Sequence, residues 1–209
     1  MSVKVTMIRE NDKRRVKTVE TEGMKKKQRH NVILKEMGIV NEDDYMIKWG
    51  KEEVTIQMKP KARAHMYVQR LKNVTENDAK VALITEVAYA MKNPEMSKYI
   101  CSYGLESLLD LLYDQIHTVK GLVALRVSMS IPEVFNQVID TQKFADKLYE
   151  LMGEEDVSIK WQAAEIICVI VTFGGMSIFR KAAKEYGRKH GQPTYVLIVQ
   201  MITTILYYL

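Results

Sequence analysis

From Pro60 onward the apolar residues recur at helical spacing, and short breaks containing glycine, proline or asparagine interrupt them. The pattern predicts helix over nearly all of this part of the chain. The expected helices cover residues 60–72, 76–92, 95–102, 104–114, 117–130, 132–140, 141–153, 157–173, 175–187 and 193–208.

The same apolar triplet occurs three times in this region. Ile84, Val87 and Met91 recur as Leu122, Leu125 and Met129 after a shift of 38, and as Ala163, Ile166 and Ile170 after a further 41. A period near 40 residues with about three helices per period is typical of armadillo and HEAT repeats. Because one such unit cannot bury its apolar face alone, about three stacked units are needed. The fold class predicted for residues 60–209 is therefore an all-α armadillo-repeat superhelix of about three repeats.

The last helix of each predicted unit carries a second set of small apolar residues. Val123 and Val127 lie beside the main apolar stripe, and Ala164 and Cys168 are their counterparts after a shift of 41. In a stack of three-helix units the last helices line the concave face, so these residues and Gln200 predict a groove for an amphipathic helix. The alternative is that they pack on the next unit.

The first 59 residues have a weaker pattern. Val3, Val5 and Met7 alternate weakly, which indicates a tail or at best a short strand. Residues 24–37 form a helical pattern that Gly38 ends, a short segment covers 45–49, and 51–58 is a connector. The expected organisation is a basic, mobile tail over 1–23, a small helical subdomain over 24–59, and the repeat domain over 60–209. The apolar stretch 195–209 has no cap, so we expect a repeat domain truncated at its C-terminal end.

Charge is concentrated in the first 30 residues, which hold ten Lys and Arg against four acids, whereas the other 179 residues have a net charge of −1. A basic segment of this kind attracts an acidic protein face, phospholipid or nucleic acid, or is a solvated tail. No aromatic residues interleave with these cations, so nucleic-acid binding is not expected. The sequence has two cysteines, no signal peptide and no apolar stretch long enough to span a membrane. Together these features indicate a cytoplasmic protein with reduced thiols.

The sequence contains no motif for catalysis. A phosphate-binding loop, a dinucleotide fingerprint and any His or Cys pair at metal-ligand spacing are missing. His117 is expected to be structural, at the start of a helix. Cys168 lies in an apolar run, where the pKa of a thiol rises. We therefore expect a binding protein without enzymatic activity, metal or cofactor.

Several segments resemble the armadillo region of diaphanous-related formins. They are residues 66–71, 81–91, 103–112, 116–119, 124–129, 150–173 and 179–202, in the order and spacing of that family. Residues 21–58 are more loosely similar to the small helical GTPase-binding subdomain that precedes it. One departure is the sequence Ser130-Ile-Pro-Glu133, where family members often carry a paired-Asn turn that faces the bound GTPase.

The resemblance implies a regulatory region. In formins of this class, the protein's own C-terminal amphipathic helix docks in the concave groove, and a GTP-bound Rho-family GTPase displaces it and releases actin assembly. GTP and Mg²⁺ would belong to the GTPase, actin would be reached through domains outside this chain, and a membrane through the GTPase or the basic tail. The location implied is the cytoplasm and the actin cytoskeleton. The residues expected at the GTPase contact are Arg29, His30, Ile33, Lys35, Glu36, Met46, Trp49, Glu133 and Asn136; those expected in the inhibitory groove are Val123, Val127, Ala164, Cys168 and Gln200.

Two other classes of function remain. An armadillo scaffold would bind a helical or extended peptide without any GTPase. An adaptor led by residues 1–30 would bind anionic membrane or nucleic acid, and deleting the tail would remove that binding.

Overall fold

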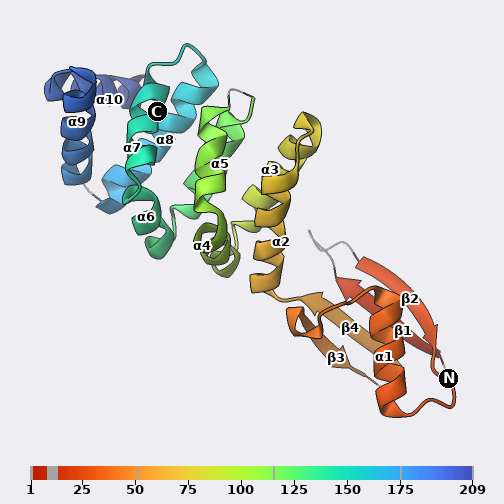
Figure 1. Ribbon diagram of the computed structural model, residues 1–209. Helices are drawn as coiled ribbons and strands as arrows, with labels where there is room; N and C mark the ends of the chain where they lie inside the picture. Colours follow the sequence, from red (N-terminus) through yellow and green to blue (C-terminus); the bar gives the residue numbers. More distant parts are fainter. Residues whose placement is uncertain (1, 9–13, 51, 115, 175, 209) are drawn as a thin grey trace. The chain divides into compact units, whose positions relative to one another are not determined.

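The computed structural model describes residues 2–8, 14–50, 52–114, 116–174 and 176–208 (Figure 1). The chain divides into two compact units, Met1–Met66 and Tyr67–Leu209, which we call unit 1 and unit 2.

Unit 1 is a four-stranded mixed sheet with one helix. Its elements are β1 (Ser2–Ile8), β2 (Arg14–Glu20), α1 (Lys26–Met37), the 3-10 turn η2 (Glu42–Asp44), β3 (Tyr45–Trp49) and β4 (Glu53–Met58). The strand order is β2-β1-β4-β3, with β1 parallel to β4 and antiparallel to β2, and β3 antiparallel to β4. This is a β-grasp arrangement, in which the first and last strands lie side by side at the centre.

The core of unit 1 lies between the sheet and α1. Val3, Val5, Val54 and Ile56 on the central strands and Ile33 on α1 are completely buried. Alternate residues of a strand point to opposite faces, so this core occupies one face of the sheet. Gly38 ends α1 in a left-handed conformation, φ 71°, which glycine adopts without steric cost.

Two predictions for this region are wrong. Residues 2–8 and 14–20 are paired strands and not a mobile tail, and residues 24–59 contribute two strands to the same sheet and are not a helical subdomain. The weak alternation of Val3, Val5 and Met7 was the signal of a half-buried strand. Its partner β4 lies about 50 positions away, and the register Val5 to Val54 shows why neighbouring residues alone did not reveal it.

Unit 2 is helical throughout its described residues, and the predicted armadillo-like architecture is confirmed. The helices are α2 (Pro60–Asn73, which spans the division between units), α3 (Asn77–Ala90), α4 (Pro94–Asp110), η3 (Leu111–Tyr113), α5 (Thr118–Ser128), α6 (Pro132–Ile139), α7 (Gln142–Met152), α8 (Val157–Gly174), α9 (Met176–His190) and α10 (Thr194–Tyr208).

The repeated triplets form the interior of this stack. All nine residues of the three triplets are at most 2% exposed. Neighbours along the row α3, α5, α8 and α10 pack side by side, and the helices between them complete each unit (Figure 1). By length and composition alone α8 could span a membrane, but seven of its residues are buried against other helices, which identifies it as a core helix of the stack.

Gly104 sets a close contact between α2 and α4. It lies at a kink inside α4, and a Cβ built on it would lie 2.6 Å from Cγ2 of Val68. A methyl group has no room there, so the glycine lets the two helices approach.

We expect Gly104→Ala to lower the free energy of unfolding by about 1–3 kcal/mol, because the added Cβ overpacks the contact with Val68. Urea unfolding followed by circular dichroism measures the change. Ser102→Ala, at an exposed position on the same helix, is the control and should stay close to the parent. Equal stability of the two variants would contradict the close-contact assignment.

Candidate functional site

An exposed aromatic cluster lies on the β3 side of α1. The ring of His30 stacks on that of Trp49 with 4.9 Å between centroids, and His30 Nε2 is 2.8 Å from a carboxylate oxygen of Glu42. Trp49 remains 42% exposed. The structure thus brings together two residues expected at the GTPase contact, His30 and Trp49, and adds Glu42.

The other expected contacts on α1 lie elsewhere. Glu36 pairs with Lys17 of β2, and a hydrogen bond from that lysine lowers the pKa of the Glu36 carboxyl. Arg29 is seven residues before Glu36 and lies on the same side of the helix. Lys35 is exposed, whereas Ile33 is completely buried in the core and offers no surface to a partner.

Met46 and Trp49 do not share a face. Tyr45 and Ile47 pack against the core, and Trp49 continues their side of β3. Met46 therefore points to the face of the sheet away from α1, because strand residues alternate. It is 42% exposed there.

Strand β2 supplies cations that were not among the expected contacts. Its register places Arg15 opposite Met7 and Lys17 opposite Val5, so both basic side chains lie on the α1 side of the sheet. We call Arg15, Lys17, Arg29, Lys35 and Glu36 the β2–α1 surface. The basic composition of residues 13–17 was visible in the sequence, but only the strand pairing places it beside α1.

Glu133 and Asn136 lie on α6 in unit 2, and both are exposed. Glu133 accepts a hydrogen bond from Lys98 Nζ at 2.6 Å, and this bond lowers the pKa of its carboxyl. The pair borders an open depression of about 290 Å³ between α4 and α6.

The predicted groove residues differ in how much surface they present. Val123, Val127 and Cys168 are half-buried on α5 and α8, and Gln200 is half-buried on α10. Ala164 is completely buried, so its expected role as a lining residue is wrong. The reason is local: Ala164 lies between Trp161 and Cys168 on one face of α8, but its methyl group is short and neighbouring side chains cover it.

A row of exposed or half-buried side chains does cross the inner helices. A shift of 38 places Tyr89 of α3 in register with Val127 of α5, and Cys168 of α8 follows 41 residues later. Tyr89 is 59% exposed, and Trp161, 49% exposed, lies on the same side of α8 as Cys168. We call Tyr89, Val127, Trp161 and Cys168 the inner-helix row. Applying the repeat shift to Val127 would have found Tyr89 from the sequence.

An ion pair crosses this row. Arg126 Nη1 of α5 donates to a carboxylate oxygen of Glu165 on α8 at 3.0 Å.

Burial and the neighbouring Glu165 carboxylate both raise the pKa of the Cys168 thiol, as the apolar run predicted. Burial also raises the pKa of Cys101 to about 12. A raised pKa makes a thiol less reactive, because the thiolate is the nucleophile.

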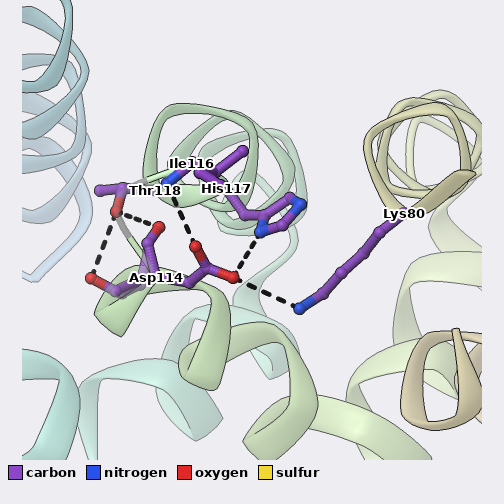
Figure 2. Close-up of polar contacts among 6 residues, drawn as sticks. Lys80, Asp114, Ile116, His117 and Thr118 are labelled. Atoms are coloured by element: carbon purple, nitrogen blue, oxygen red, sulfur yellow. Dashed lines mark hydrogen bonds and ion pairs between the residues drawn. The ribbon is translucent and has the colours of Figure 1, made fainter. Parts of the chain in front are cut away.

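A polar cluster of Lys80, Asp114 and His117 holds α5 to the preceding helices (Figure 2). Asp114 accepts from the backbone N–H of Ile116 at 3.1 Å, lies 2.5 Å from His117 Nδ1, and pairs with Lys80 Nζ of α3 at 3.5 Å. His117 is completely buried at the N-terminus of α5. The hydrogen bond with His117 is the main reason that the pKa of the Asp114 carboxyl is lowered. The structural role predicted for His117 is supported by this position.

Within the described residues, no group of three or more His, Cys, Asp or Glu side chains is arranged to hold a metal ion.

The polar cluster of Lys80, Asp114 and His117 predicts that the stability of the fold depends on pH. A lowered folded-state pKa means that Asp114 stabilises the fold above the ordinary carboxyl pKa, about 4, and that this contribution is lost as the pH falls through the lowered value. Asp114→Asn should therefore lower the urea midpoint at neutral pH, and its difference from the parent should shrink in acid. Asp140→Asn, at an exposed carboxylate, is the control. A difference for Asp114→Asn that is independent of pH would contradict this role.

One comparison with known proteins bears on this chain. Residues 115–205, which include α5 to α9 and most of α10, match the family model described as the FHOD1/3 FH3 domain. No curated protein matches the chain. The match indicates a formin FH3, armadillo-like region over residues 115–205, which is the part of the chain that carries the inner helices α5 and α8.

Proposed function

We propose that the chain is a regulatory region of a formin of the Rho-effector kind, in which unit 1 binds a GTP-bound Rho-family GTPase and unit 2 holds an autoinhibitory helix. The FH3 match over 115–205 carries this proposal, together with the separately folded basic unit that precedes it. Formin-driven actin assembly would be regulated by release of that helix.

The charge of unit 1 supports an acidic partner. Residues 1–66 contain 16 Lys and Arg against 10 Asp and Glu, a net charge of +6, whereas the rest of the chain has −1. The acids Glu42, Asp43 and Asp44 are gathered in η2, on the side of His30 and Trp49. The β2–α1 surface has four cations and one acid, so an acidic GTPase face fits it better.

The edge of β2 adds a second feature to this surface. Within the described residues β2 pairs only with β1, which leaves its outer backbone N–H and C=O groups available. An unpaired edge is a template for a partner strand, and its lysines and arginines select the charge of that partner. We therefore place the GTPase contact on the β2–α1 surface and not on the aromatic cluster around Trp49.

The inner-helix row supports the second binding event. Packed helices lie about 8–10 Å apart, so α3, α5 and α8 together span about 20 Å. An amphipathic helix of about 13 residues has that length at 1.5 Å per residue. Tyr89, Val127 and Trp161 are apolar groups that such a helix would bury, and the Arg126–Glu165 pair offers polar contacts beside them.

The regulation then follows from two ligands whose binding is mutually unfavourable. If the GTPase lowers the affinity of the helix, the helix lowers the affinity of the GTPase by the same factor, because coupling free energy is reciprocal. A scaffold that binds a helical or extended peptide without a GTPase is the second candidate, and it is favoured by the fact that the inner-helix row lies wholly within unit 2.

The GTPase contact is tested by capture with Rho-family GTPases loaded with GDP or a GTP analogue. We expect retention only with the analogue. Arg15→Glu with Lys35→Glu should slow association about tenfold or more at low salt, because steering by opposite charges is lost. Lys72→Glu with Lys120→Glu changes the net charge equally at exposed positions outside unit 1 and serves as the control. Retention that ignores the nucleotide would support the scaffold.

The groove is tested with a C-terminal fragment of the full-length formin as the probe. Val127→Asp should weaken binding at least about tenfold, because docking would bury a carboxylate without a partner. Val40→Asp places the same charge at a fully exposed position of unit 1 and should bind like the parent. Circular dichroism of both variants checks the fold, and normal binding by folded Val127→Asp would remove α5 from the groove.

A further inference from the structure

Helix α9 carries a line of cations that has no part in the proposed regulation by a GTPase and an autoinhibitory helix. Arg180, Lys181, Lys184 and Arg188 are all exposed. Successive residues of a helix rotate by about 100°, so these four side chains fall within about 100° of arc and extend over about 12 Å of helix. We call them the α9 stripe.

The opposite side of α9 is attached to unit 2. Ala183 is completely buried, and Tyr186 packs against Tyr149 of α7 with 5.2 Å between ring centroids. These contacts determine the rotation of α9 about its axis. They direct the α9 stripe away from the stack, at the end of unit 2 where α9 is drawn in Figure 1.

The cations of the stripe are not neutralised by neighbours. Lys189 pairs with Asp146 of α7 at 2.7 Å, but none of the four stripe residues forms an ion pair with a residue that the structure describes. From position 166 to 209 the sequence contains five Lys and Arg and a single acid, Glu185. Helix α10, which follows, contains no charged residue. The four cations of the stripe therefore outnumber the single acid beside them, Glu185, which lies one turn from Lys181.

The charge of this surface favours a partner with negative charge spread over a broad area. The described side chains of the stripe offer no apolar anchor of the kind that concentrates binding energy in a protein interface. A row of cations on one helix face instead matches a surface of evenly spread negative charge. Clusters of four or more Lys and Arg on one helix face bind anionic lipids in this way.

We propose that the α9 stripe is a docking surface for an anionic membrane. Binding is electrostatic: guanidinium and ammonium groups contact lipid phosphates and carboxylates, the helix stays outside the hydrocarbon, and no segment needs to refold. This surface is separate from the β2–α1 surface in unit 1, so it does not depend on GTPase binding. It gives unit 2 its own means of reaching a membrane.

The test is sedimentation of the full chain with vesicles of equal parts phosphatidylserine and phosphatidylcholine. We expect Arg180→Glu, Lys184→Glu and Arg188→Glu together to weaken binding at least about tenfold, since each cation contributes separately. The matched control is Lys61→Glu, Lys72→Glu and Lys120→Glu, which makes the same change of charge at exposed positions outside both α9 and residues 1–30. It should retain most of the binding.

The outcomes are distinct. Equal losses in the two triple variants, a larger loss in the control, or no binding by the parent would each overturn the α9 assignment. Undiminished binding to vesicles of phosphatidylcholine alone, or binding that is unchanged by salt, would also overturn it. If the stripe variant keeps vesicle binding but loses capture of an acidic protein, the surface serves a protein partner and the membrane proposal is wrong. Circular dichroism confirms that all variants are folded.

Discussion

Unit 2 depends on one constraint: no single helical repeat can bury its own apolar face. Ile84, Leu122 and Ala163 are completely buried only because α3, α5 and α8 pack side by side. Each inner helix therefore supplies part of the interior of its neighbour, and the stack is stable as a row of units and not as separate repeats. The same packing leaves one side of each inner helix toward solvent, which is where Tyr89, Val127 and Cys168 lie. Burial and the candidate binding surface thus follow from one arrangement.

Polar contacts fix how neighbouring helical repeats of unit 2 are placed against one another. The Arg126–Glu165 pair joins α5 to α8, and the polar cluster of Lys80, Asp114 and His117 joins α3 to the start of α5. Apolar packing alone tolerates small sliding movements, whereas hydrogen bonds to a carboxylate have narrow geometry. These contacts therefore align the inner helices, and with them the spacing of the groups that a docked helix would meet.

Unit 1 separates charge across a small α/β fold. Its basic residues concentrate on β2 and α1, and an acidic turn lies beside β3. The basic region of the sequence is thus part of a folded, directional surface. A mobile tail would present the same charge to every side, but a strand paired in a defined register presents Arg15 and Lys17 on the α1 side. The cations of β2 therefore occupy a defined side of the sheet.

The sequence by itself determined the helical repeats of unit 2, the end of α1 at Gly38 and the structural role of His117, because helical periodicity and caps depend on residues within a few positions of one another. Tertiary structure alone decided the sheet of unit 1, where β1 pairs with a strand some 50 positions away. It also decided that Ile33 and Ala164 are interior, that His30 stacks on Trp49, and that Arg15 lies beside α1. Each of these depends on which distant segments meet, and a local pattern of apolar and polar residues carries no information about that pairing.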